Sequence, residues 1–233
     1  MNNINKFKKL IENGTDRKMS SYKCIYKAGT GEIEEKKSRF ICHVCPVENE
    51  EEAVAFINLK KKEYWDARHN CSAFVIGEKA ELTRCSDDGE PAGTAGRPML
   101  EVLLNEEIRN VAVVVTRYFG GVLLGTGGLV RAYQAAVKAG LEASSVIEKQ
   151  TGIRARLVSD YTGVGKLQYI FDKNRYTVLE SRYEESVTFT LLIPTEEWNG
   201  AVKAVTEATS GKSELVKEDD CVFGTVDGEV IVF

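Results

Sequence analysis

An apolar run that leads into a glycine-rich loop and then into an amphipathic stretch most constrains how this chain folds. Residues 111–115 are apolar on both faces, which is typical of a covered strand at the centre of a sheet. Five glycines follow within residues 119–128, and eight of the chain's 20 glycines lie between Gly89 and Gly128. From Leu129 to Leu141 apolar residues recur at steps of three and four, which predicts a helix that packs on that sheet.

Shorter patterns predict the remaining elements. Apolar periodicity indicates further helices near 49–64, 99–104, 162–173 and 198–205, and Asn49 is placed to cap the first of them. Strand-like runs occur at 22–27, 39–47, 71–76, 111–118, 153–158, 176–179, 187–193 and 214–222. From residue 151 the order is strand, helix, strand, strand, helix, strand, which is the split βαβ pattern of a ferredoxin-like domain.

These patterns together predict an α/β (α+β) fold with two domains. We place the first domain at 19–147 and the second at 148–233, with residues 143–151 as the connector. Residues 1–18 are polar and rich in lysine, and we interpret them as an extension outside the first domain.

Composition excludes several classes of protein. The chain has 233 residues, 43% of them hydrophobic, a formal net charge of −4 and no apolar run near the ~20 residues that span a bilayer. It has no signal-peptide pattern, so we expect a cytoplasmic protein, no membrane partner and six reduced cysteines. Residues 151–233 carry 9 basic and 14 acidic side chains, which argues against general binding of phosphate backbones there.

An acidic, glycine-containing segment is the first candidate site. Asp87, Asp88 and Glu90 lie within four residues, and Thr94 is placed to cap the next helix. Carboxylates at this spacing could hold a hard cation or serve as acid and base, with His69 and Arg97 as accessory candidates. The alternative is a structural turn that shapes the loop and caps the helix.

The glycine-rich loop after the buried strand is the second candidate, as a site for an anion or a nucleic acid. Free N–H groups at a helix start favour an anion, and arginines flank the loop on both sides. The loop matches neither the Walker pattern nor the dinucleotide fingerprint, and its glycines could equally serve tight packing. The candidate residues are Arg117, Tyr118, Gly120, Gly121, Gly125, Thr126, Gly127, Gly128 and Arg131.

Two cysteine motifs favour structural roles. His69 and Cys71 would share one face of a strand, but no third group orients them for nucleophilic catalysis, so a core thiol is the simpler interpretation. Cys42 and Cys45 lie in a strand-like run that sends them to opposite faces, which argues against a zinc site. We therefore assign no catalytic residue, no metal and no cofactor, and we interpret the lysines at 60–62 as a solvated helix face.

Several motifs in a fixed order resemble the YigZ/IMPACT family. They are Asp-Asp-Gly-Glu-Pro at 87–91, Gly-Thr-Ala-Gly at 93–96, Thr-Arg-Tyr-Phe-Gly-Gly at 116–121, Leu-Gly-Thr-Gly-Gly-Leu at 124–129 and Arg-Ala-Tyr at 131–133. The resemblance implies a first domain like the second domain of the S-five type ribosomal protein, a ferredoxin-like second domain, and a pair similar to the last two domains of elongation factor G. It also implies a role in translation, because eukaryotic relatives regulate it. Some relatives are labelled peptidases, but no metal-ligand or nucleophile set here supports that label.

We therefore expect a non-enzymatic cytoplasmic regulator of translation that binds RNA, the ribosome or a translation-associated protein. In this hypothesis the two glycine clusters leave a charged recess open on the first domain, where Arg117 and Arg131 contact the partner. An enzyme that acts on a phosphorylated or anionic small molecule is the alternative, and a third hypothesis makes both loops structural.

Overall fold

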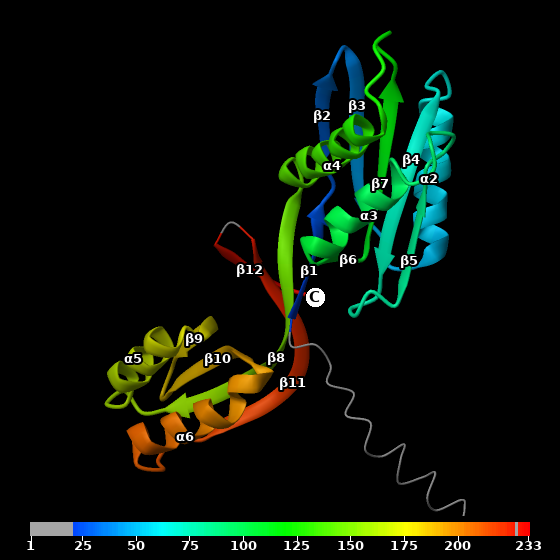
Figure 1. Cartoon of the computed structure of the whole chain (residues 1–233). Coiled ribbons are helices and arrows are strands. Elements are labelled where there is room, and N and C mark those ends of the chain that lie inside the picture. Colours follow the sequence, from blue (N-terminus) through cyan, green and yellow to red (C-terminus); the bar gives the residue numbers. More distant parts are fainter. Residues whose placement is uncertain (1–20, 227) are drawn as a thin grey trace, which may run out of the picture.

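The computed structural model describes residues 21–226 and 228–233, and the predicted extension at 1–18 lies outside them. Figure 1 shows two α+β domains, as the sequence predicts, with a first domain in blue to green and a second in yellow to red. No helix in the described ranges is long and apolar enough to cross a membrane.

The first domain is built on a five-stranded sheet in the order β2-β3-β7-β4-β5, in which every neighbouring pair is antiparallel. The strands are β2 (Thr30–Glu35), β3 (Ser38–Pro46), β4 (His69–Ile76), β5 (Leu82–Ser86) and β7 (Val111–Tyr118). The helices are α2 (Glu50–Glu63), α3 (Gly96–Asn105) and α4 (Thr126–Glu142). Helices α3 and α4 cover one face and α2 covers the other, so the central strand β7 is buried on both sides, as its apolar run predicts (Figure 1).

Local sequence explains the helix positions. The side chain of Asn49 accepts a hydrogen bond from the Glu52 backbone N–H at 2.9 Å, so Asn49 caps α2 as predicted. In α4 the apolar positions at steps of three and four are all buried against the sheet and α3. That match confirms the periodicity that predicts the helix.

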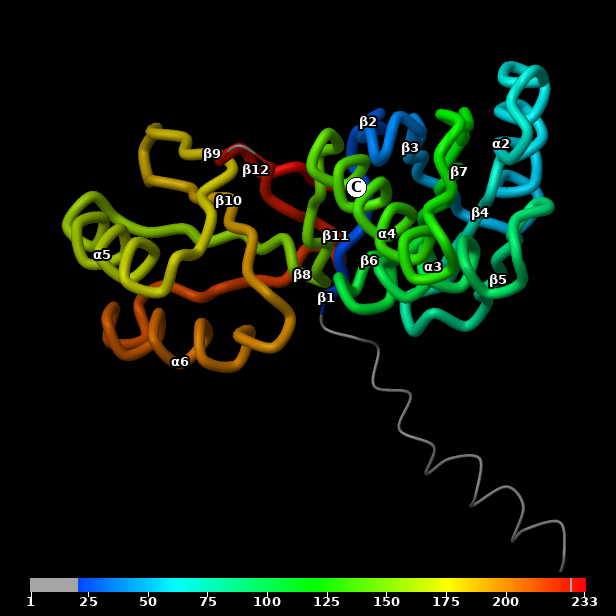
Figure 2. The backbone as a smooth tube through the Cα atoms, turned by 45° about the horizontal axis from the view of Figure 1, so that its top comes forward, coloured from blue at the N-terminus to red at the C-terminus, as the bar shows by residue number. Residues whose placement is uncertain are grey.

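The second sheet joins the two domains through one long strand, β8 (Ser145–Ser159). The first part of β8 pairs with β1 (Ser21–Lys27), and its second part pairs with β10 (Val187–Pro194). On its other edge β8 pairs with β11 (Leu215–Val226), and the small strands β6 (Ile108–Arg109) and β12 (Glu229–Val232) complete the path. Of the segment 143–151, predicted as a connector, residues 145–151 form the start of this strand, and β8 runs from one domain into the other in both backbone views (Figures 1 and 2).

The second domain follows the predicted order of elements. After β8 come α5 (Val164–Asn174), β9 (Thr177–Tyr183), β10, the short helix η1 (Thr195–Glu197), α6 (Trp198–Thr209) and β11. The strands lie in the order β9-β10-β8-β11, with all pairs antiparallel, which is the arrangement of a split βαβ unit. Both long helices pack on one face around a separate core that includes Leu157, Phe171 and Phe189.

We predict that Gly31→Ala destabilises the first domain. A Cβ at Gly31 would overlap the backbone of Ala139 and Gly140 in α4, and backbone cannot rotate away as a side chain can. The expected loss is about 1–3 kcal/mol of unfolding free energy, measured by urea denaturation. Gly200→Ala in α6 is the control: nothing lies within 4 Å of the added Cβ, so this variant should be as stable as the parent or up to about 1 kcal/mol more stable.

Candidate functional site

A buried ion pair joins the two glycine-containing segments. Arg117, near the end of β7, donates from Nη1 to Oε1 of Glu90 in the acidic segment at 2.7 Å. Arg117 is only 6% exposed and Glu90 only 8%. Tyr133 of α4 donates its hydroxyl to the same carboxylate oxygen at 2.8 Å, so one carboxylate ties a strand, a loop and a helix together.

The rest of the Arg117 side chain is enclosed by aromatic rings. Its guanidinium carbon lies 5.4 Å from the ring centre of Phe40 and 5.6 Å from that of Phe119, distances at which a cation is attracted to a ring face. The Nε of Arg117 is buried and has no hydrogen-bond partner within the described residues. The structure therefore places Arg117 inside the domain, and not on the open charged recess that the sequence analysis expected.

The same network reaches Cys71, which the sequence analysis weighed as a nucleophile. The thiol lies 2.9 Å from the carbonyl oxygen of Asp87 and 3.3 Å from the hydroxyl oxygen of Tyr133. Burial raises the pKa of Cys71 to about 12, so the sulfur carries its proton at neutral pH. His69 Nδ1 lies 3.0 Å from the backbone oxygen of Asp88, so the imidazole also contacts the loop backbone.

Asp87 holds the start of α3. Its carboxylate accepts from the backbone N–H groups of Gly93 at 2.8 Å, Ala95 at 3.0 Å and Gly96 at 2.8 Å. Partial burial acts to raise the pKa of Asp87, but the three backbone donors outweigh it and hold that pKa below its usual range. Asp87 thus caps α3 from a distance, and the predicted cap by Thr94 is wrong, because the Thr94 hydroxyl donates to the Pro91 carbonyl at 2.7 Å.

The other acidic side chain of the segment points elsewhere. Asp88 accepts from the backbone N–H of Asn70 at 2.7 Å and forms an ion pair with Lys61 of α2. Lys61 is thus paired, although the sequence analysis interpreted the three lysines there as a solvated face. The three carboxylates serve three different partners, and no group of three or more His, Cys, Asp or Glu in the described ranges is arranged to hold a metal ion.

The glycine-rich loop divides into a packed part and an open part. The Gly120 backbone N–H donates to the Ser38 hydroxyl at 3.1 Å, and a Cβ at Gly120 would overlap the backbone at Lys37. By contrast, Gly121 and Gly125 have positive φ angles of 84° and 72° and nothing within 4 Å of an added Cβ. Tight packing therefore explains Gly120, while turn geometry explains Gly121 and Gly125.

The start of α4 is open to solvent. Gly125 is its N-cap, and no side chain caps the first turn, in which Thr126 and Gly127 are exposed. Arg131 is exposed one turn further along, with its guanidinium close to Gly127. Tyr118 donates its hydroxyl to Asp66 at 2.9 Å. Of the two arginines that flank the loop, only Arg131 reaches the surface, while the accessory candidate Arg97 pairs with Glu101 in the next turn of α3.

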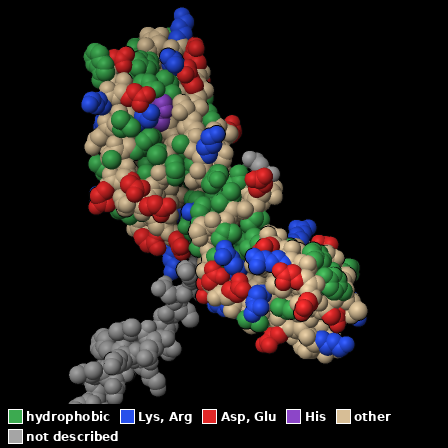
Figure 3. Space-filling model, turned by 180° about the vertical axis from the view of Figure 1, so that it is seen from behind, with side chains coloured by type: hydrophobic (Ala, Val, Ile, Leu, Met, Phe, Trp, Pro, Cys, Tyr) green, Lys and Arg blue, Asp and Glu red, His purple; other side chains and the backbone are tan. Residues whose placement is uncertain are grey.

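Large exposed apolar side chains gather at the same end of the domain. Leu123 is 83% exposed and Phe119 is 50% exposed in the glycine-rich loop, and Trp65 is 81% exposed in the loop between α2 and β4. The hydrogen bond between Tyr118 and Asp66 ties these two loops together. We call Trp65, Phe119, Leu123 and Arg131 the loop end. Figure 3 shows hydrophobic, basic and acidic side chains together at the far end of the first domain.

The loop end was only partly predicted. Arg131 was a candidate from the sequence, but Leu123 and Trp65 were not. The available signal was that Leu123 lies among glycines and outside the helical periodicity, where an apolar side chain has no neighbouring positions with which to form a core face.

The motif Cys42-His43-Val44-Cys45 splits between two faces of β3, as predicted. Cys42 is buried in the main core, whereas Cys45 lies on the face toward α2. His43 is 5% exposed on that second face, with its ring centre 4.9 Å from that of Tyr64. Burial, reinforced by the Lys60 ammonium and opposed by Glu63, lowers the pKa of His43 to about 4.

We predict that His43 makes stability depend on pH between about 6.5 and 4. The native state holds His43 neutral, whereas the unfolded chain takes up a proton near pH 6.5, so stability is full above that value and falls as the pH is lowered. At pH 5 the expected loss is about 2 kcal/mol relative to pH 7.5. Urea denaturation of the parent and of His43→Gln checks this: the gap between their pH dependences should have this size, and parallel curves would contradict the prediction.

We predict that Glu90→Gln lowers the free energy of unfolding of the first domain, because it leaves the Arg117 charge buried without a counter-charge. The expected loss is about 3–5 kcal/mol. Glu101→Gln is the matched control, because it breaks an exposed pair with Arg97 and should cost less than about 1 kcal/mol. Urea denaturation measures both variants. Equal losses would show that the buried pair contributes no more than a surface one.

The fold and this site define a two-domain α+β protein whose first domain is organised around a buried arginine–glutamate pair beneath a glycine-rich loop. Residues 36–141 match the Impact N-terminal domain, and residues 157–212 match a domain of unknown function, DUF1949. YvyE of Bacillus subtilis, an IMPACT family member, is 43% identical over 205 residues, which cover 88% of this chain and 94% of YvyE. The chain belongs to the IMPACT family.

Two solved structures are also similar to this chain. A crystal structure described as that of a hypothetical protein is 32% identical with a TM-score of 0.55, and the match covers 86% of this chain and 98% of that one. A structure of Yih1, described as a two-domain translational regulator, is 28% identical with a TM-score of 0.36 over 51% of this chain and 48% of Yih1.

Proposed function

We propose that this protein is a non-enzymatic regulator of translation in the cytoplasm, and that it binds the ribosome through the loop end. Membership of the IMPACT family supports the link to translation. The observation that carries the choice of surface is the exposure of Leu123 and Trp65 together with that of Arg131. Exposed apolar groups of this size on one end of a domain are typical of a binding surface.

The interior network supports a binding protein over an enzyme. Each carboxylate of the acidic segment is engaged: Asp87 by backbone N–H groups, Asp88 by Lys61 and Asn70, and Glu90 by Arg117. The buried thiol of Cys71 keeps its proton. These groups have the contacts of structural residues, which leaves the alternative of an enzyme on an anionic small molecule without an available acid, base or nucleophile in this segment.

The chemistry of the loop end suits a ribosomal surface. Trp65 and Phe119 supply exposed aromatic side chains of the kind on which bases stack, Leu123 supplies apolar area, and Arg131 supplies a charge for phosphate. The first turn of α4, which has exposed residues and no side-chain cap, adds backbone N–H donors for the same phosphate. The protein has a net charge of −4, so binding must depend on this local surface and not on bulk attraction.

We predict that Leu123→Asp and Arg131→Glu each lower the fraction of protein that co-sediments with ribosomes at least fivefold. The first adds a charge to the apolar contact, and the second reverses the charge that faces phosphate. Tyr169→Asp on α5 is the control for an exposed apolar residue of the second domain, and Lys138→Glu, two turns further along α4, is the control for charge. Both controls should bind as the parent does.

Co-sedimentation measured at a series of salt concentrations separates the phosphate contact of Arg131 from the apolar contact of Leu123. Contacts to phosphate weaken as the salt concentration rises, so the logarithm of the parent's association constant should fall linearly with the logarithm of the salt concentration. Arg131→Glu should reduce the steepness of that line by about one. Co-sedimentation that neither loop-end variant lowers would overturn the loop end as the binding surface.

A further inference from the structure

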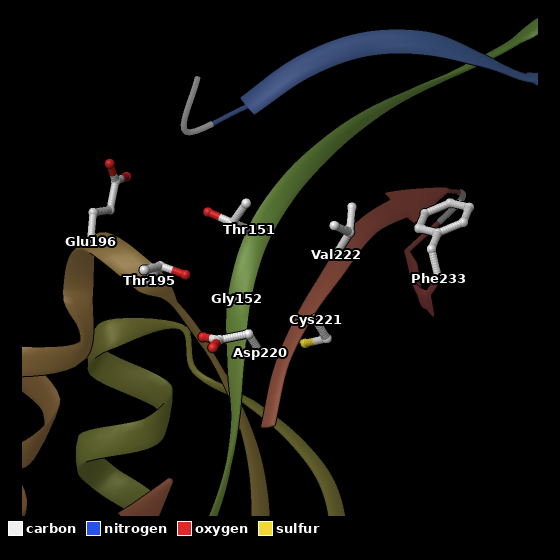
Figure 4. Close-up of a pocket in the computed structure, with 8 residues that line it drawn as sticks. All are labelled: Thr151, Gly152, Thr195, Glu196, Asp220, Cys221, Val222 and Phe233. Atoms are coloured by element: carbon white, nitrogen blue, oxygen red, sulfur yellow. The ribbon is translucent and has the colours of Figure 1, made fainter. Parts of the chain in front are cut away.

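An open groove lies where the two domains meet. It has a volume of about 590 Å³ and is lined by Thr151 and Gly152 of β8, Thr195 and Glu196 of η1, Asp220, Cys221 and Val222 of β11, and Phe233. Figure 4 shows these residues on β8, η1 and β11, with Phe233 from the chain end after β12 beside them. Phe233 is 51% exposed at the rim, with the Lys149 ammonium 4.2 Å from its ring centre, so the groove presents apolar surface to solvent.

The strand register brings the start of the described chain to this groove. On one edge of β8, Ser21 of β1 pairs with Gln150, and Pro194 of β10 pairs with Gly152. The beginning of β1 and the end of β10 therefore lie next to each other on this edge of β8, opposite Thr151. Each is about 4.8 Å from β8, the usual spacing between neighbouring strands. Thr195 and Glu196 follow directly after Pro194, and Figure 4 shows the blue strand β1 beginning above Glu196 and Thr151 in that view.

Residues 1–20 precede Ser21 and have a composition that matches the groove. Five basic residues, Lys6, Lys8, Lys9, Arg17 and Lys18, stand against two acidic ones. The apolar residues Ile4, Phe7, Leu10 and Ile11 recur at steps of three and four, a spacing that would place them on one side of a helix. The segment thus offers an apolar stripe among cations.

The charges on the groove complement this segment. Glu196 makes no ion pair within the described residues, and Asp220 has a single exposed partner, Lys217, at 2.7 Å. A cation beside Glu196 would therefore gain a counter-charge without displacing an existing pair. The apolar surface of Val222 and Phe233 lies across the same hollow.

We propose that the segment 1–11 docks in this groove of its own chain. Its apolar stripe covers Val222 and Phe233, and its lysines pair with Glu196 and Asp220 at the rim. Residues 12–20 form the tether: nine residues span at most about 30 Å, which is ample for a groove that begins beside Ser21. A tether of this length gives an effective concentration of the order of millimolar, so a modest contact suffices. The proposal is independent of the proposed function.

Carbodiimide coupling of the full chain tests the proposal, because this reagent joins a lysine amine to a carboxylate in contact with it. Mass spectrometry should find peptides joined through Lys6, Lys8 or Lys9 to those that contain Glu196 or Asp220. In the double variant Phe7→Asp and Ile11→Asp, which breaks the apolar stripe, the yield of these cross-linked peptides should fall at least fivefold. In the matched control Asn3→Asp,Asn13→Asp, which adds the same charge within residues 1–20, the yield should stay within twofold of the parent.

A second measurement decides the result if coupling is inefficient. Backbone amide signals of Thr151 and Val222 in NMR spectra of the full chain should shift in the apolar variant and stay in place in the control. Unchanged signals in the apolar variant, or equal effects of both variants, would overturn the proposal. Coupling in an equal mixture of 14N- and 15N-labelled chains shows whether the docked segment belongs to the same chain as the groove. Cross-linked products that carry a single label support docking within one chain. Mixed-label products at half of the total would overturn the proposal in favour of docking on a second copy.

Discussion

The buried pair of Arg117 and Glu90 is the interaction on which the first domain depends. Two charges removed from water are tolerated only when they are paired and hydrogen-bonded, and here each partner is held by other elements. Tyr133 of α4 supplies a further donor to Glu90, and Phe40 of β3 lies against the guanidinium. The pair therefore fixes α4, β3, β7 and the acidic segment relative to one another.

This arrangement separates the interior from the contact surface. The acidic segment and Arg117 carry most of the charge that the sequence suggests for a binding site, but this charge is used inside the protein: Glu90 pairs with Arg117, Asp87 accepts from backbone N–H groups, and Asp88 pairs with Lys61. What remains outside at the loop end is apolar, with Arg131 beside it. Leu123 can stay exposed because the loop that bears it is anchored from beneath, at Phe119 by the Arg117 guanidinium and at Gly120 by Ser38.

The sequence predicts the elements with strong local patterns and misses those that depend on distant partners. The buried strand at 111–118, the helix at 126–142 and the Asn49 cap follow from periodicity and capping chemistry. The strands at 30–35 and 82–86 were missed because they lie at the two edges of their sheet, where only a few apolar side chains are needed.

The candidate site follows the same division. Its glycines and charged residues were predicted, because they are conspicuous in the sequence, but the exposed Leu123 and Trp65 were missed, and the roles of several predicted residues were not foreseen. Whether Arg117 faces water depends on Glu90, 27 residues earlier in the chain, and the cap of α3 comes from Asp87 across a loop. Such pairings are set by the tertiary fold, and no local pattern in the sequence encodes them.

Strand β8 has a mechanical consequence for the whole molecule. It is hydrogen-bonded along its length, to β1 in the first domain and to β10 and β11 in the second, so no free linker separates the two. A change in the angle between the domains must then bend or twist this strand, and the region around Gly152, where β1 gives way to β10, is the place where the ladder on one edge is interrupted. Reorientation of the domains would therefore be elastic and of small amplitude, unlike the free rotation of domains on a flexible tether.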